Sequence, residues 1–135
     1  VVEDYRNRDL KGEVVPFITD MAGAYRCAHM VISRAGATTI SELAALGKPS
    51  ILIPYPYAAN RHQEVNARSL VQAGGAVMIL QEDMSGEGLA RVITRYMDDR
   101  SALDKMGENA HRMGRLDAAR IIVDQLAEIL GVNVN

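Results

Sequence analysis

Hydrophobic positions along the chain follow two periods in turn, and this alternation predicts strands separated by helices. The predicted strands are short apolar runs at residues 14–15, 30–33, 50–53 and 76–80. The predicted helices are amphipathic stretches at residues 20–28, 38–46, 61–73 and 85–97. The run at 50–53 is nearly apolar throughout, which is typical of strands buried on both faces of a parallel sheet. We therefore expect a doubly wound α/β domain.

Residue types at the predicted helix ends support these bounds. Thr19 or Asp20 can cap the helix that ends near residue 28, and Ser85 can cap the helix that follows it in the sequence. Gly47 suits the end of helix 38–46, with Pro49 just beyond it.

Two apolar stripes at helical spacing close the chain. The first consists of Leu103, Met106, Ala110 and Met113. The second consists of Leu116, Ala119, Ile122, Val123, Leu126, Ile129 and Leu130. The charges opposite the second stripe are of both signs, so we expect a helix that packs on the domain rather than one that lies on a membrane.

Composition restricts the classes of function. The chain has 135 residues, 48% of them hydrophobic, which fits one globular domain over residues 1–135. Its formal net charge is −2 without a basic cluster, so we expect no nucleic-acid partner. Cys27 is the only cysteine, which excludes an internal disulfide. The spacing of His, Cys, Asp and Glu predicts no protein-bound metal, and we expect no cofactor.

A small-residue turn between strand 30–33 and helix 38–46 is the strongest candidate site. Backbone N–H groups at a helix start attract phosphate, and the small residues around Gly36 allow a ligand to come close. Thr38 and Thr39 add hydroxyls, and Glu42 lies one turn further, where a carboxylate suits the vicinal hydroxyls of a ribose. Two alternatives stay open: tight strand–helix packing requires the same small residues, and Glu42 is an ordinary solvated helix position.

Two other segments carry candidate groups. Gln63 opens a helix after a long loop, and its amide can bind sugar hydroxyls. Spacing alone favours a different interpretation, an ordinary polar first turn of a helix that Asn60 caps. His62 has no Ser or Cys partner at the spacing of a catalytic triad. The segment 17–21 offers an apolar wall for a base, although packing around a capped helix is favoured there without more context. Because ligands of parallel sheets bind at the carboxyl ends of the strands, we expect the loops after Val15, Ser33 and Ile53 to meet.

Three segments together resemble the MurG family, bacterial UDP-N-acetylglucosamine transferases of peptidoglycan synthesis. The segments are VVPFITDM at 14–21, SRAGATTISE at 33–42 and NRHQEVNA at 60–67. The resemblance implies the C-terminal, donor-binding half of a GT-B fold, with a Rossmann-like sheet. It also implies an inverting transfer from UDP-N-acetylglucosamine to lipid I, which gives lipid II.

The resemblance also assigns roles by position. Ile18 reads the uracil edge through its backbone, between Phe17 and Met21. Glu42 binds the ribose and Gln63 the N-acetylglucosamine hydroxyls. His62 stands where some members carry a second Gln, and Arg34 fits the family without an assigned role. The sugar and diphosphate meet the helix start through Ala37, Thr38 and Thr39.

The family's N-terminal half, with the lipid acceptor face and the proposed general base, is not in this sequence. We therefore expect a truncated domain without catalytic residues of its own, which is inactive as it stands. Val1 is not an initiator methionine, and a first strand, phosphate loop and helix of the donor domain are expected upstream of it. The resemblance implies a peripheral enzyme at the cytoplasmic face of the inner membrane. The alternative is a non-catalytic donor-binding subunit of a split UDP-sugar transferase.

Overall fold

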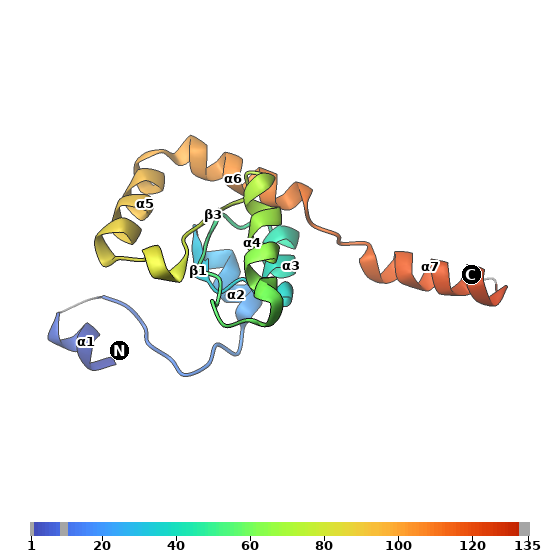
Figure 1. Cartoon of the computed structure of the whole chain (residues 1–135), viewed down its shortest axis with the longest axis horizontal. Coiled ribbons are helices and arrows are strands. Elements are labelled where there is room, and N and C mark those ends of the chain that lie inside the picture. Colours follow the sequence, from blue (N-terminus) through green and yellow to red (C-terminus); the bar gives the residue numbers. More distant parts are fainter. Residues whose placement is uncertain (1, 9–10, 133–135) are drawn as a thin grey trace.

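A parallel sheet of three strands lies at the centre of the molecule, as the computed structural model shows for residues 2–8 and 11–132 (Figure 1). The strands are β1 (Val31–Ser33), β2 (Ser50–Leu52) and β3 (Ala76–Met78), in the order β1-β2-β3. Val31 pairs with Ser50, and Ser50 pairs in turn with Ala76. The middle strand β2 is buried along its whole length, as its apolar run predicts.

Seven helices accompany the sheet in the part of the chain that is described. They are α1 (Val2–Asn7), α2 (Met21–Cys27), α3 (Ala37–Ala45), α4 (His62–Gln72), α5 (Gly86–Asp98), α6 (Arg100–Arg112) and α7 (Ala118–Leu130). Helices α3 and α4 each connect two neighbouring parallel strands, so right-handed crossovers place both on one face of the sheet. They contact each other there, and α6 packs on α3.

The core consists of a few large side chains and many small ones. Leu43, Leu52 and Leu70 are fully or almost fully buried between the sheet and its helices. Helix α6 comes very close to the turn after α3, because it has a glycine at the contact. A Cβ atom on Gly107 would lie 2.8 Å from the carbonyl oxygen of Gly47.

Glycine in the left-handed conformation ends α3 and α4. Gly47 has φ +59° and Gly74 has φ +76°. After α3, the N–H of Gly47 donates to the carbonyl of Ala44, and the N–H of Lys48 donates to the carbonyl of Leu43. This Schellman pattern turns the chain back into the sheet, and it confirms Gly47 as the stop that the sequence predicts.

The strand predicted at Val14 and Val15 is wrong. Residues 11–20 form no strand, and the two valines are 37% and 43% exposed. The described sheet consists of β1, β2 and β3 alone, so the two valines pair with none of its strands, and Pro16 has no N–H to donate to a ladder. The loop after Val15 is therefore an irregular approach to α2 rather than a turn at the end of a strand.

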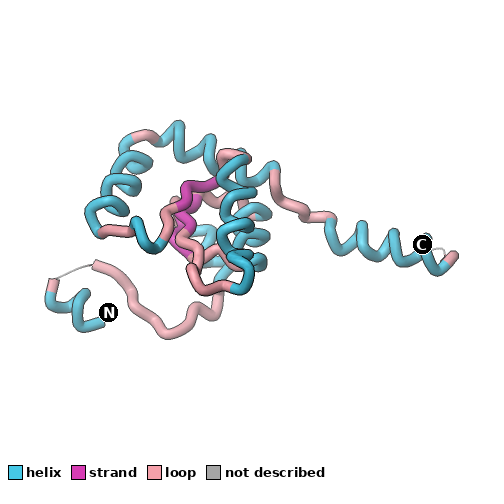
Figure 2. Tube along the Cα trace, in the orientation of Figure 1, coloured by secondary structure: helices cyan, strands magenta, loops and turns pink. Residues whose placement is uncertain are grey.

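The last helix does not pack on the domain, contrary to expectation. The apolar stripe is helical, as predicted, but α7 stands away from the body (Figures 1 and 2). The side chains of the stripe are exposed, for example Ile122 at 56% and Ile129 at 79%. The chain leaves the body where Gly114 lies against the backbone of α3, and α6 already covers that side of α3.

Candidate functional site at the carboxyl edge of the sheet

The amino end of α3 offers free backbone donors. Gly36 precedes the helix in an extended conformation, and no side chain caps the helix. The first helical hydrogen bond runs from Ile40 N to Gly36 O at 2.9 Å, so the N–H groups of residues 37–39 have no partner within the helix. These N–H groups and the helix dipole make the turn attractive to a phosphate.

The small residues of this turn serve two different purposes. Ala35 is completely buried in the core, so its size is a packing requirement. Gly36 is different, because a Cβ there would meet only Thr39 Oγ1 at 3.7 Å, an ordinary contact, and its φ of −63° suits any residue. Packing therefore explains Ala35 but does not explain Gly36. The open space at Gly36 is available to a ligand.

Glu42 is fixed by a neighbour that the sequence did not single out. The hydroxyl of Tyr25 on α2 donates to Glu42 Oε2 at 2.9 Å. Tyr25 is 6% exposed, and burial together with the Glu42 carboxylate raises the pKa of its hydroxyl to about 12. Glu42 itself is exposed, and a carboxylate that accepts one hydrogen bond keeps the capacity to accept others. Tyr25 falls four residues after Met21, a helical spacing that could have flagged it.

Two amides of α4 hold the turn after β1 by its backbone. Gln63 Oε1 accepts from the N–H of Ala35 at 3.3 Å and from the N–H of Tyr55 at 3.0 Å. Asn66 Nδ2 donates to the carbonyl of Ala35 at 3.2 Å. Gln63 thus joins the loops after β1 and β2, and its amide oxygen is already used. Its NH₂ group is what it can offer a sugar hydroxyl. Asn66 was not predicted, although its spacing of three places it on the same helix face as Gln63.

Arg34 has a structural role that the sequence left unassigned. Its guanidinium donates to the carbonyls of Ile53 and Pro54 at 3.2 and 3.3 Å. It also lies over the ring of Tyr55, 5.6 Å from the ring centroid. Arg34 therefore fastens the loop after β2 to the end of β1.

The start of α4 differs from the predicted cap. Asn60 belongs to a short 3₁₀ turn, Ala59–Arg61, and the residue before the helix is Arg61. Both adopt the left-handed conformation, with φ of 49° and 51°, which asparagine tolerates and which is costly for arginine. His62 Nδ1 lies 2.7 Å from the carbonyl of Ala59 and so donates to it, which leaves Nε2 as an acceptor in the neutral ring.

Phe17, Ile18 and Met21 lie on the surface rather than in the core. They are 76%, 43% and 39% exposed, so the alternative of core packing is wrong. Together they line a hollow of about 520 Å³, with Tyr5 and residues 13–16 around them. An apolar hollow of this kind can hold a flat base.

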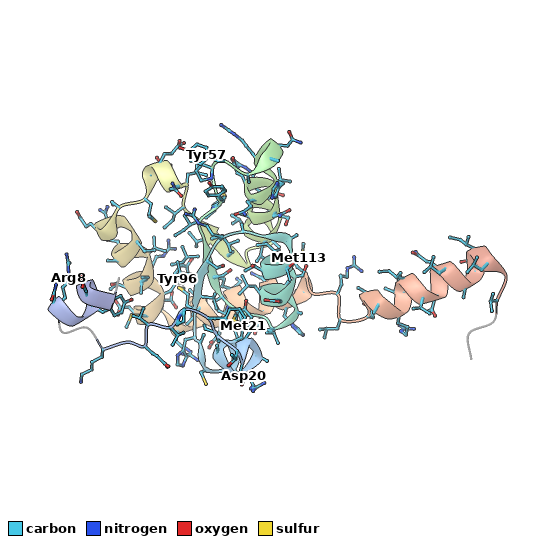
Figure 3. All side chains as sticks on the ribbon, turned by 90° about the horizontal axis from the view of Figure 1, so that it is seen from below. Arg8, Asp20, Met21, Tyr57, Tyr96 and Met113 are labelled. Carbon is cyan, nitrogen blue, oxygen red and sulfur yellow. The ribbon has the colours of Figure 1, made fainter. Side chains whose placement is uncertain are left out.

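A second hollow lies at the other side of the site. It has a volume of about 510 Å³ and is lined by Pro54, Tyr55, Pro56, Tyr57, Arg61, Glu64, Leu80, Gln81 and Glu82. In Figure 3, Tyr57 and Met21 lie toward opposite ends of the body. Of the three loops expected to meet, those after β1 and β2 do so, joined by Gln63 and Arg34. Residues 16–20 have no hydrogen bond to either loop among the described residues, and α2 reaches α3 through the Tyr25–Glu42 bond.

Among residues 2–8 and 11–132, no helix has the length and apolar character needed to cross a membrane. The same residues contain no cluster of three or more His, Cys, Asp and Glu side chains able to hold a metal ion.

Comparison with known proteins finds similarity over most of the chain. The model of the glycosyltransferase family 28 C-terminal domain matches residues 1–122. A relative from Trichlorobacter lovleyi is 48% identical over 124 residues, which are 92% of this chain and 32% of the relative. One from Geobacter sulfurreducens is 46% identical over 126 residues, 93% of this chain and 35% of the relative. Both are named UDP-N-acetylglucosamine--N-acetylmuramyl-(pentapeptide) pyrophosphoryl-undecaprenol N-acetylglucosamine transferase.

A solved structure agrees with the sequence comparison. The crystal structure of Acinetobacter baumannii MurG matches with a TM-score of 0.84 and 34% identity, over 94% of this chain and 40% of that chain. The chain spans about a third of the length of the curated relatives it matches. These findings confirm the resemblance and the Rossmann-like parallel α/β fold that the sequence predicts.

Proposed function

Because the chain belongs to the family of glycosyltransferase family 28 C-terminal domains, we propose that it binds UDP-N-acetylglucosamine, the donor after which its relatives are named. The complete protein is then an N-acetylglucosaminyltransferase of peptidoglycan synthesis. Its acceptor is a muramyl pentapeptide linked to undecaprenyl pyrophosphate, lipid I. The observation that carries the proposal is the uncapped start of α3, with Glu42 one turn further on and Gln63 holding the same turn.

We assign the groups of a UDP-sugar to the site in the order in which the ligand carries them. The hollow beside Phe17, Ile18 and Met21 receives the uracil, with the Ile18 backbone at its edge. Glu42 accepts the ribose hydroxyls. The diphosphate lies at the free N–H groups of Ala37, Thr38 and Thr39. The sugar lies toward α4, within reach of the Gln63 NH₂ group and His62 Nε2.

The chemistry that these groups supply is binding and charge stabilisation. When the sugar leaves UDP, negative charge grows on the diphosphate, and the N–H groups and dipole at the start of α3 stabilise it. Positioning of the acceptor hydroxyl and removal of its proton fall to the rest of the complete protein. None of the donor-site residues is proposed as an acid or base.

The acceptor also suggests where the complete protein works. Undecaprenol is a lipid, so the acceptor resides in a membrane, whereas a UDP-sugar is a water-soluble donor. We therefore place the complete protein peripherally at the cytoplasmic face of the bacterial inner membrane. Its membrane contact lies mostly outside this chain.

Titration of this chain with UDP-N-acetylglucosamine, followed by ¹H–¹⁵N NMR, tests the donor role directly. Separate titrations with UDP-glucose and with ADP serve as controls. Glu42→Ala is the test variant, and Glu128→Ala, an exposed carboxylate on the remote helix α7, is its matched control. We expect shifts at Ile18, Thr38 and Gln63 that Glu42→Ala reduces and Glu128→Ala leaves unchanged.

Each contrary result has a distinct meaning. An equal response to ADP would exclude uracil recognition by the Ile18 hollow. An equal response to UDP-glucose would exclude a role of Gln63 and His62 in choosing N-acetylglucosamine. A well-dispersed spectrum without any response would contradict donor binding by this chain.

A further inference from the structure

Tyr25 approaches the predicted ribose site from a different helix. Its hydroxyl lies 2.9 Å from Glu42 Oε2, and the two residues are 17 positions apart in the sequence. The Tyr25 ring is part of the core cluster with Leu43 and Leu52, and the residue is 6% exposed. Glu42, by contrast, is an exposed side chain with three rotatable bonds. The buried hydroxyl of Tyr25 thus holds the Glu42 carboxylate, which would otherwise be free to rotate.

Helix α2 is capped at its start and held by another segment at its end, and both contacts limit the movement of Tyr25. At its start, Asp20 Oδ1 accepts from the N–H of Gly23 at 2.8 Å. At its end, Lys48 Nζ donates to the carbonyl of Ala28 at 3.1 Å. Lys48 lies in the turn directly after α3, so the end of α2 is fastened close to the helix that carries Glu42. The distance between the hydroxyl and the carboxylate is therefore set by the fold.

We propose that Tyr25 is a positioning residue for nucleotide binding, which holds the Glu42 carboxylate in the orientation that accepts the two vicinal hydroxyls of a ribose. The inference rests on the proposed donor site. A carboxylate has about four lone-pair positions, and Tyr25 occupies one of them, which leaves enough for both ribose hydroxyls. Ordering the carboxylate before the ligand arrives reduces the entropy lost on binding.

The competing explanation is that the bond merely ties α2 to α3. The two explanations differ in what they predict for different ligands. A positioning role matters only for a ligand that has ribose hydroxyls. A tie between helices affects every ligand of the site to the same extent.

The test compares UDP with 2′,3′-dideoxy-UDP on the whole chain by calorimetric titration. Tyr25→Phe keeps the ring and removes only the hydroxyl, and Tyr96→Phe on α5 is the matched control. We expect Tyr25→Phe to weaken UDP binding about three- to tenfold, the effect of one hydrogen bond to a charged group that is partly transmitted to the ligand. Binding of the dideoxy ligand stays within about twofold of the unchanged protein, because Glu42 has no hydroxyls to accept there. In the Glu42→Ala background, Tyr25→Phe has no further effect on UDP.

The outcomes separate this inference from the donor proposal. If the unchanged chain binds no UDP, both are overturned. If it binds UDP and Tyr25→Phe weakens both ligands equally, or neither, the positioning role alone is overturned. A second measurement needs no variant: ¹³C relaxation of the Glu42 γ-methylene without ligand, compared with Glu128. An ordered Glu42 beside a mobile Glu128 supports the inference, and equal mobility of the two overturns it.

Discussion

Gln63→Glu and Asn66→Asp make the same chemical change, an amide to a carboxylate, at two half-buried positions of α4. Both side chains bind the backbone of Ala35, but with opposite polarity. Gln63 accepts from its N–H at 3.3 Å, and Asn66 donates to its carbonyl at 3.2 Å. A carboxylate can replace the first contact but not the second. The two substitutions should therefore have very different effects on stability.

The expected magnitudes follow from the burial of Ala35. This residue is completely buried, so neither of its backbone groups can turn to water. Gln63→Glu keeps an acceptor for the N–H groups of Ala35 and Tyr55, and we expect the free energy of unfolding to change by less than about 1 kcal/mol. Asn66→Asp removes the donor and sets a charged oxygen against the Ala35 carbonyl. Loss of the bond and the repulsion together should cost about 2–4 kcal/mol.

Urea unfolding at neutral pH, followed by far-UV circular dichroism, measures the difference. The Asn66→Asp penalty should shrink in acid, because a protonated carboxyl can donate to the carbonyl again. The introduced carboxyl has a folded-state pKa above its unfolded value of about 3.9, so the folded form is favoured below that value and loses ground as pH rises. Equal stability of the two variants at neutral pH would refute the polarity argument, as would an Asn66→Asp penalty that grows in acid. If Gln63 binds the sugar, the Gln63→Glu variant should bind UDP-N-acetylglucosamine no more tightly than it binds UDP, because the contact with the sugar is lost.

Three more outcomes follow from the structure. Gly107→Ala should lower the free energy of unfolding by about 1–3 kcal/mol, because the clash with the Gly47 carbonyl outweighs a helix-propensity gain of about 1 kcal/mol; a higher melting temperature would contradict this. Burial and Glu42 raise the pKa of Tyr25 to about 12, so the stability from its neutral hydroxyl is complete below pH 10 and falls between pH 10 and 12. The free energy of unfolding falls by about 2–3 kcal/mol at most. The urea midpoint should decline more between pH 10 and 12 for the unchanged chain than for Tyr25→Phe, and parallel declines would contradict the raised pKa of Tyr25. Ending the chain at residue 117 removes the exposed stripe of α7 and should change the unfolding free energy of the body by less than about 0.5 kcal/mol; a loss above about 1 kcal/mol would show that α7 packs on it.

Local patterns in the sequence predicted the elements around the sheet well. The apolar run at 50–53 became the buried middle strand, and Gly47 ended α3 in the left-handed conformation that favours glycine. Asp20 and Ser85 both cap helices, as their side chains predict. These features depend on a few neighbouring residues, so the sequence expresses them directly.

The predictions that failed depended on partners far away in the chain. Val14 and Val15 have the composition of a strand, but a strand also needs a neighbour to pair with, and they pair with none of the described strands. The stripe of α7 has the period of a packing helix, but the period does not say which surface covers it. The cap at Asn60 failed because the chain takes left-handed turns at Asn60 and Arg61 that neither residue type demands.

By itself, the sequence determined the family and the parallel α/β architecture, because these depend on short motifs and on hydrophobic period. The donor-site residues that it names stay predictions. The tertiary structure alone decided how the candidate residues are held. Tyr25 reaches Glu42 from another helix, and Arg34 fastens the loop after β2. Gln63 binds the N–H of Ala35, and Asn66 binds its carbonyl. These contacts join residues 17 to 31 positions apart, and hydrogen bonds of that kind form only after the strands and helices have packed together.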